Sequence, residues 1–502
     1  MIVEDIERFA FLAVALMCLS VNVASAQSFE EIKKRQQDAF GAYKSNAEAE
    51  FEAYRSRLNA EFAEFMRRSW TKKDSKEPLK NVPTVPDVPP VVLPDLDEVE
   101  IPEDNEIDVV DVTPIVIEDE PISITPIKYK PRPKEKTVEF TLYGTPCRVR
   151  FDLDGREYMR GSDENAAADF WKALSSGSYD NILADCLEAK RSLNLCDWAY
   201  YKMLDAVSKA IYGTRNETAM LCAFLMNQSG FKVRLGRSGD GKIHLLVNTA
   251  GDICNYSYYT LGGENYYLVE DDGVGSMHIF DNAFPKEKSL RLTIQEENNV
   301  AVKTSRERVL RSRKYPEVTV APNANLNLLE LYSDYPHAYT DGDSRTMWGI
   351  YANAPMSRGV REKIYPKLAE SIKGRTQAEA ANILINFVQT AFEYKTDDES
   401  WGYERAFFPD ETLYYPYSDC EDRAILFSRL VRDLMGLKAV LLYYPGHLAA
   451  AVEFAERIPG DYIILNGHRY LVCDPTYINA DIGMTMPGMD NSKAYVIMLE
   501  QL

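Results

Sequence analysis

Three residues in the C-terminal part of the chain, Cys420, His447 and Asp474, have the types and spacing of a nucleophilic cysteine site. A thiolate is a strong nucleophile, and a histidine beside it can take the thiol proton and later protonate the leaving group. An acid bonded to that histidine fixes its tautomer and stabilises its cation. Together they predict acyl transfer through a thioester on Cys420. The alternative is that all three residues are structural.

The charges around the thiol work against this chemistry. Asp419, Glu421 and Asp422 are its neighbours in the sequence and disfavour a thiolate. For a reactive thiol, Arg423, a protonated His447 and the positive end of a helix must outweigh these acids.

The elements that carry the three residues follow from the apolar pattern. Cys420 opens an amphipathic helix, which Gly436 ends. Its apolar face is formed by Leu426, Phe427, Leu430 and Val431. The strands predicted after it are Leu437–Tyr444, Leu448–Phe454 and Tyr470–Cys473. A helix start, the start of a strand and a loop after another strand can meet at one end of a sheet, so the three side chains can converge.

An earlier segment, 214–271, has the same features in the same order. A helix with a similar apolar face is followed by Gly230, and His244 opens a later strand, 27 residues before Asp271 as His447 is before Asp474. We therefore expect a duplication. The position of Cys420 is taken by Thr214, which lacks the N-terminal amine that catalytic threonines use as a base. The first copy is expected to be a structural or ligand-binding relic.

The later segment resembles the transglutaminase-like superfamily, a branch of the papain-like cysteine enzymes. The match covers residues 340–502 and rests on a cysteine that starts the core helix, a histidine that leads a strand, and an aspartate followed by Pro475-Thr476. The helix 378–394 precedes this core as expected. The resemblance implies Cys420 as nucleophile, His447 as base and Asp474 as orienting acid. It also implies an α+β fold with two tandem cores, each a helix packed on an antiparallel sheet. The superfamily includes transamidases, peptidases, amidases and inactive scaffolds.

A zinc site is the competing interpretation of these residues, because Cys473 adjoins Asp474. Neighbours along a strand face opposite sides, so the two do not easily join one site with Cys420 and His447. We expect no metal and no cofactor.

The N-terminus has the pattern of an export signal. An apolar run extends from Phe9 to Val21, too short to span a bilayer, and small residues at 24–26 supply a cleavage pattern. Cleavage after Ala26 predicts a periplasmic or extracellular protein with no transmembrane segment in the mature chain.

Residues 28–70 predict one long helix with two aromatic rows that repeat every eleven residues. The rows are Phe29, Phe40, Phe51 and Phe62, and Ile32, Tyr43, Tyr54 and Phe65. This stripe has to pack on the protein's own folded part, on a second copy or on an envelope ligand.

The next stretch, 81–125, has eight prolines, thirteen acids and no lysine or arginine, which predicts an extended disordered linker. The alternating pattern at 107–117 leaves a docking role open.

The predicted organisation has six parts: a signal peptide (1–26), a long helix (27–75), a disordered linker (76–135), a degenerate core (136–285), a β-rich connector (286–336) and a catalytic core (337–502). The net charge of −20 argues against a nucleic-acid partner. The expected function is an exported cysteine-dependent amide-bond enzyme, a hydrolase or an acyltransferase, with a protein or peptide substrate. The alternative is an inactive binding or scaffold protein of the cell envelope.

Overall fold

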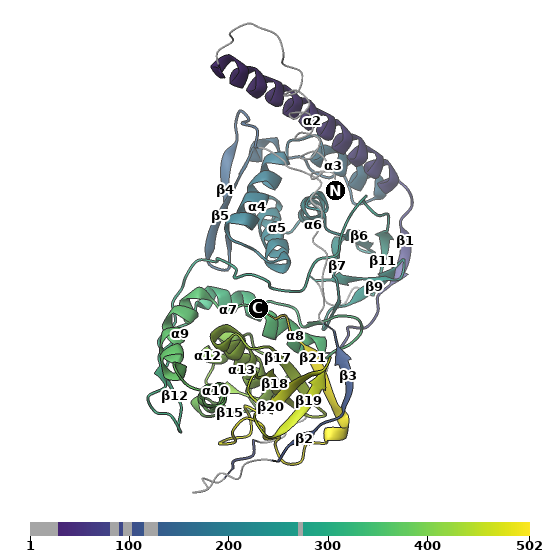
Figure 1. Ribbon diagram of the computed structural model, residues 1–502. Helices are drawn as coiled ribbons and strands as arrows, with labels where there is room; N and C mark the ends of the chain where they lie inside the picture. Colours follow the sequence, from purple (N-terminus) through teal and green to yellow (C-terminus); the bar gives the residue numbers. More distant parts are fainter. Residues whose placement is uncertain (1–28, 81–89, 94–102, 115–128, 270–274, 502) are drawn as a thin grey trace. The chain divides into compact units, whose positions relative to one another are not determined.

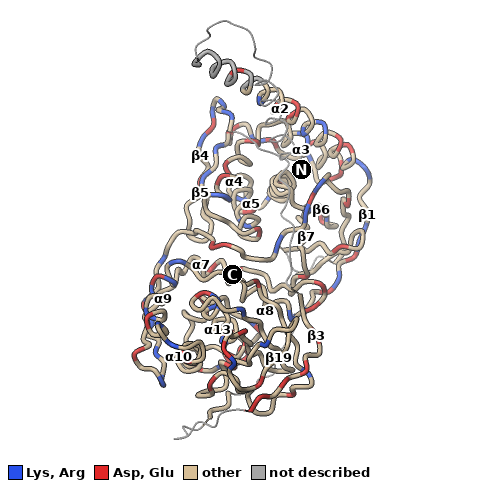
Figure 2. Tube along the Cα trace, in the orientation of Figure 1, with Lys and Arg blue, Asp and Glu red and all other residues tan. Residues whose placement is uncertain are grey.

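The computed structural model describes residues 29–80, 90–93, 103–114, 129–269 and 275–501 (Figure 1). It divides into two compact units, 1–58 and 59–502. The protein is of the α+β class, with helices and several sheets, which confirms the predicted fold class. Basic and acidic residues are interspersed over most of the described residues, except at 103–114, which carry acids and no lysine or arginine (Figure 2). Among the described residues, no helix is both long enough and apolar enough to cross a bilayer. The predicted signal peptide lies outside them.

Helix α2, Phe29–Met66, occupies the range of the predicted long helix but ends before residue 75. The indole Nε1 of buried Trp70 donates a hydrogen bond to the carbonyl oxygen of Met66 at 3.0 Å. This gives a partner to one of the carbonyl groups that the end of a helix leaves without an intrahelical donor. Strand β1, Thr71–Asp74, follows. In the part of α2 before residue 59, three members of the aromatic rows are exposed: Phe40, Tyr43 and Tyr54.

The first large sheet is antiparallel and has the strand order β1-β11-β6-β7-β10-β9. Its remaining strands are β6 (Val233–Ser238), β7 (Ile243–Asn248), β9 (Tyr258–Leu261), β10 (Glu264–Leu268) and β11 (Ser276–Phe280). Helix α6, Asn216–Gln228, packs on β6 and β7. The elements before it are β4 (Lys136–Leu142), β5 (Thr145–Phe151), α3 (Glu164–Leu174), α4 (Asp180–Ser192) and α5 (Asp197–Tyr212). Phe62, near the end of α2, packs its ring against the rings of Trp171 and Phe280 in this core.

The second large sheet has the order β2-β19-β20-β18-β17-β21-β3, with β2 (Asn105–Glu106) and β3 (Val109–Thr113) at its edges. Its five inner strands are β17 (Ala439–Tyr444), β18 (His447–Glu453), β19 (Asp461–Leu465), β20 (His468–Cys473) and β21 (Ala494–Met498). The helices of this part are α8 (Thr346–Asn353), α9 (Arg358–Ile372), α10 (Gln377–Ala391), α11 (Asp397–Ser400), α12 (Pro409–Tyr414) and α13 (Cys420–Met435). Helix α13 packs on β17 and β18. Ala450 and Val452 of β18 join the core cluster beneath α10 and α13, whereas Ala449 and Ala451 join a separate cluster.

The inner strands of the two sheets follow the same order. The first sheet runs β11-β6-β7-β10-β9 and the second runs β21-β17-β18-β20-β19. In both, a helix packs on the two strands that follow it in the chain, α6 on β6 and β7, and α13 on β17 and β18. Each sheet is extended at an edge by a strand from the N-terminal part of the chain, β1 beside β11 and β3 beside β21.

The structure departs from the predicted disordered linker, 76–135, at residues 105–113. Strand β2, Asn105–Glu106, pairs in parallel with β19, and strand β3, Val109–Thr113, pairs in parallel with β21. Ile107, between them, is buried in the core cluster on one face of the sheet. The physical reason is that a sheet edge offers unpaired N–H and C=O groups, which an extended segment can satisfy whatever its charge. Residues 107–113 of the alternating segment thus lie against the protein's own sheet, whereas residues 115–117 lie outside the described residues.

The predicted β-rich connector, 286–336, has little strand in the structure. Its elements are β12 (Leu310–Arg311), β13 (Thr319–Val320) and α7 (Leu326–Ser333). Leu290, Leu292 and Ile294 alternate with more exposed residues and are buried, yet they form no named strand. The alternating pattern predicted the burial correctly, but a strand also needs a run of hydrogen-bonded neighbours. Here the contacts are two isolated bridges, between Phe231 and Lys288 and between Thr249 and Leu290. Downstream, β14 (Ala338–Tyr339) pairs with β8 (Asp252–Ile253).

Candidate functional site

Cys420 is the first residue of α13, as the sequence predicts. Asp419 precedes the helix and forms a capping box with Asp422, in which each side chain accepts a hydrogen bond from the backbone N–H of the other residue. Gly436 ends the helix in the left-handed conformation, with φ of 64°. These local signals hold the Cys420 side chain at the N-terminus of the helix, where it is 2% exposed.

His447 and Asp474 meet in the structure. His447 is the first residue of β18, and its Nε2 lies 2.8 Å from Oδ2 of Asp474, with both side chains fully buried. The other carboxylate oxygen, Oδ1, accepts hydrogen bonds from the backbone N–H groups of Thr476 and Tyr477 at 2.9 and 3.2 Å. Both carboxylate oxygens of Asp474 therefore accept hydrogen bonds, and the backbone N–H groups of Thr476 and Tyr477 fix the orientation of the carboxylate.

Gln389, on α10, holds the loop that carries Asp474. Its Nε2 donates to the carbonyl oxygens of Asp474, Tyr477 and Ala480 at 3.3, 2.7 and 3.0 Å. Sequence reasoning gave Gln389 no role, because nothing in the sequence connects it to a loop some 90 residues later. We interpret it as a positioning residue for Asp474.

The thiol lies beside the strand that His447 opens. The backbone N–H of Leu448, the residue after His447, is hydrogen-bonded to the sulfur of Cys420. Because Nε2 of His447 is bonded to Asp474, Nδ1 is the ring nitrogen left to exchange a proton with a nucleophile. Nδ1 is buried and has no hydrogen-bond partner within the described part of the chain.

In the structure the surroundings of Cys420 favour the protonated thiol. Burial raises the pKa of Cys420 well above its ordinary value, and the carboxyls of Glu421 and Asp419 raise it further. The thiol donates to Oε2 of Glu421, 3.2 Å away. Arg423 turns its guanidinium away from this acid toward Ser418 Oγ and two carbonyl oxygens.

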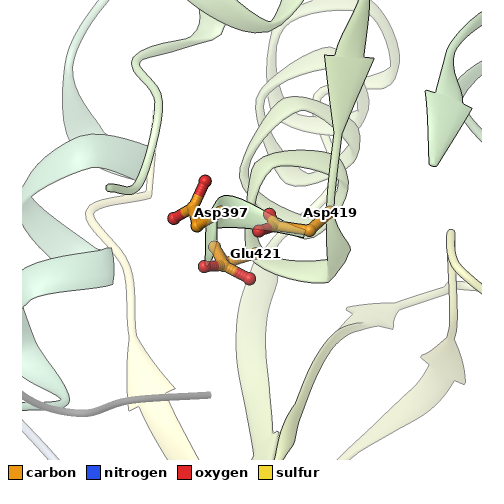
Figure 3. Close-up of side chains that lie close together, drawn as sticks. All are labelled: Asp397, Asp419 and Glu421. Atoms are coloured by element: carbon orange, nitrogen blue, oxygen red, sulfur yellow. The ribbon is translucent and has the colours of Figure 1, made fainter. Parts of the chain in front are cut away.

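Three carboxyl groups lie together at the start of α13 (Figure 3). Asp397, Asp419 and Glu421 are all buried, and each offers an oxygen within 4.8 Å of the others. Burial, with the nearby acids, raises the pKa of all three, that of Asp397 to about 8. Asp419 and Glu421 are visible beside the thiol in the sequence, but Asp397 reaches them from α11 and only the fold reveals it.

The first sheet holds no equivalent of this site in the described residues. His244 is buried on β7 and bonds to Ser238 Oγ at 3.1 Å through Nε2, and Asp271 lies outside the described residues. Helix α6 begins at Asn216, so Thr214 precedes the helix and does not occupy the place that Cys420 has in α13. The Asn216 side chain accepts from the N–H of Ile243, the first residue of β7. It thus links helix and strand much as Cys420 contacts Leu448.

Two further buried acids, both on α12, predict a pH dependence of stability. Burial raises the pKa of Asp410 to about 6 and that of Glu411 to about 7. A carboxyl whose pKa is higher in the folded chain stabilises it fully below the unfolded pKa, and this stabilisation is lost as pH rises through the folded pKa. Asp410→Asn has no carboxyl to titrate at this position. We therefore expect the difference in unfolding free energy, wild type minus variant, to fall by roughly 3 kcal/mol between about pH 4 and pH 7.

Urea unfolding of wild type, Asp410→Asn and the exposed control Asp398→Asn at several pH values measures this difference. A difference between wild type and Asp410→Asn that stays constant with pH would show that Asp410 has an ordinary pKa in the folded chain.

Comparison of the chain with protein-family models, with curated proteins and with solved structures found no match. The fold and the site define an α+β protein in which a buried cysteine lies beside a strand that carries a buried histidine–carboxylate pair.

Proposed function

We propose that this protein is a cysteine-dependent amide-bond enzyme of the transglutaminase-like type, with Cys420 as nucleophile, His447 as base and Asp474 as orienting acid. The proposal rests on the arrangement of the His447 ring. Its Nε2 is hydrogen-bonded to Asp474, and its buried Nδ1 has no hydrogen-bond partner among the described residues. The backbone N–H of the next residue, Leu448, is hydrogen-bonded to the Cys420 sulfur. Nδ1 is then free to act as the base.

In the proposed reaction the Cys420 sulfur attacks the carbonyl carbon of an amide, and its proton passes to Nδ1 of His447. The tetrahedral intermediate collapses, the C–N bond breaks, and the same proton goes to the leaving amine. The acyl-thioester on Cys420 is then taken by water, which gives hydrolysis, or by a second amine, which gives transfer. Peptide hydrolysis is the preferred outcome, because water is abundant in an exported setting.

We also propose that the two large sheets descend from one duplicated unit, with cores at 136–285 and 337–502. The shared order of five inner strands, with a helix packed on two of them in each case, supports this origin. The buried, partnered His244 and the absence of a cysteine at the start of α6 support a non-catalytic role for the first core.

The proposed setting is outside the cytoplasm, in the periplasm or beyond the cell, with a protein or peptide as substrate. The export pattern of residues 1–26 supports it. Exposed Phe40 and Tyr43 on α2 support self-association through this helix.

The alternative function is a non-catalytic binding protein. The specific observation in its favour is that Cys420, His447 and Asp474 are at most 2% exposed, and that the thiol donates to Glu421. Catalysis requires these residues to become accessible to a substrate, whereas a binding role does not.

Labelling of Cys420 by an iodoacetamide fluorophore, located by peptide mapping, tests the proposal. We expect His447→Gln, which keeps side-chain bulk but removes the base, to slow labelling of Cys420 by about 100-fold or more. His468→Ala is the matched control, because this histidine is exposed and pairs with Glu453. In urea all variants should label alike. If folded His447→Gln labels at the wild-type rate, the binding-protein alternative holds.

A further inference from the structure

The carboxyl cluster at the start of α13 is made by residues from two elements. Asp397 is the first residue of α11, and Asp419 and Glu421 flank the nucleophile candidate. Each contributes an oxygen to a group whose members all lie within 4.8 Å of one another. Two ligands of one calcium ion, bound at 2.3–2.6 Å, are separated by at most about 5 Å. The cluster therefore has the size of a coordination shell.

The nearest cationic side chains are bonded elsewhere. Arg423 donates its guanidinium hydrogens to Ser418 Oγ and to the carbonyl oxygens of Gln389 and Phe392. Arg405 directs its guanidinium to Glu411 at 2.5 Å, and only its backbone N–H reaches Asp397. Buried acids normally need a cationic partner or a proton.

Two oxygens of the cluster lack a hydrogen-bond donor. Oδ1 of Asp419 and Oε1 of Glu421 are buried, in side chains at least nine-tenths buried, and receive no N–H or O–H among the described residues. The second oxygen of each is in use, since the Asp419 side chain accepts from the backbone of Asp422 and Glu421 Oε2 accepts from Cys420. A shared proton joins two carboxyls, whereas a single cation can contact all three.

We propose that Asp397, Asp419 and Glu421 bind a hard divalent cation, Ca²⁺ or Mg²⁺, at the N-terminus of α13. The donors are all carboxylate oxygens, the ligands that these ions prefer over the sulfur and nitrogen ligands favoured by zinc. One dication offsets two of the three negative charges of the ionised cluster. This site goes beyond the proposed enzyme function and does not depend on it, because the cation would bind whether or not Cys420 is a nucleophile.

A bound cation would also change the surroundings of the thiol. It would bind Glu421, which in the structure accepts a hydrogen bond from the thiol. It would also place a positive charge beside Asp419 and Glu421, the two acids next to Cys420 in the sequence. Ion binding and cysteine reactivity would then be linked.

Direct binding to the full chain tests the site. Tb³⁺, a luminescent substitute for Ca²⁺, is titrated with excitation through tryptophan, and Ca²⁺ or Mg²⁺ is then added to displace it. We expect saturable binding in wild type, and at least about tenfold weaker binding in Asp397→Asn and in Glu421→Gln. Asp398→Asn, the adjacent exposed acid on α11, is the matched control and should bind as wild type does. Trp401→Phe, at the end of α11, should reduce the luminescence without changing the affinity.

Thermal unfolding gives a second readout that does not require the variants to match wild type in stability. Added Ca²⁺ or Mg²⁺ should raise the Tm of wild type and of Asp398→Asn, and leave the Tm of Asp397→Asn nearly unchanged. Without cation, Asp397→Asn should be as stable as wild type or more so, because it removes one of three crowded acids. The site would be overturned, in favour of a shared proton, if wild type showed no saturable binding. It would also be overturned if Asp397→Asn and Glu421→Gln bound the ion as tightly as wild type does. Neither result would bear on His447-dependent labelling of Cys420.

Discussion

Asp474→Asn is expected to lower the rate of acylation of Cys420 by about 10³ to 10⁴-fold. The reason lies in the hydrogen bonds of the carboxylate. Oδ1 of Asp474 accepts from the N–H groups of Thr476 and Tyr477, so the single oxygen of an asparagine has to stay there. Its NH₂ group then faces Nε2 of His447 and requires that nitrogen to be unprotonated. The neutral ring must carry its proton on Nδ1, where it can no longer accept the thiol proton.

The release of p-nitrophenol from p-nitrophenyl acetate, with detection of the acetyl group on Cys420 by mass spectrometry, measures this rate. Asp474→Ala does not impose the wrong tautomer and should lose less than Asp474→Asn, an order that a purely structural role for Asp474 would not produce. Asp490→Asn is the control, since Asp490 is a surface residue that caps a 3₁₀ turn. Acylation of Asp474→Asn within about a factor of ten of wild type would exclude Asp474 as the orienting acid.

The local framework of this site could be predicted because its signals are local. The apolar face of 420–435 and Gly436 predict a helix, and α13 has those bounds. The strand that His447 opens and the strand ending at Cys473 are likewise β18 and β20, within two residues of the predicted limits. Such patterns report the period of a helix or strand and its ends, which depend on neighbouring residues.

The contacts of the candidate site were harder to predict, because they join distant segments. That Nε2 of His447 bonds to Asp474, that Gln389 holds the loop after Asp474, and that Asp397 approaches Glu421 all depend on how the elements pack. The charges beside Cys420 in the sequence also describe its surroundings incompletely, because burial of the thiol, which only the fold reveals, is the largest cause of its raised pKa.

The errors in the fold have a related cause. Composition correctly describes 81–125 as acidic and proline-rich, but it says nothing about open sheet edges elsewhere. Asn105 pairs with Asp461, more than 350 residues later, and Asp104 accepts hydrogen bonds from Arg457 and Arg469. Basic residues of the folded part thus interact with an acid that looked like part of a self-repelling tether.

Arg423→Met is expected to lower the free energy of unfolding by about 3 to 5 kcal/mol. The guanidinium is 1% exposed and donates to Ser418 Oγ at 3.1 Å and to the carbonyl oxygens of Gln389 and Phe392 at 3.3 and 3.2 Å. Methionine fills much of the volume but leaves these buried acceptors without donors, and it removes a positive charge close to Asp419. Arg423→Lys keeps the charge without the planar set of donors and should lose less.

Urea unfolding measures the loss, and Arg457→Met is the matched control on an arginine that is 83% exposed, with an expected change within about 0.5 kcal/mol. Equal stability of Arg423→Met and wild type would mean that the desolvation of the guanidinium offsets all three of its hydrogen bonds. The same variant should slow acylation of Cys420 even below the unfolding transition. Arg423 bonds to the backbone of Gln389, whose side chain holds the loop of Asp474, so losing the arginine loosens the support of the orienting acid as well as the start of α13.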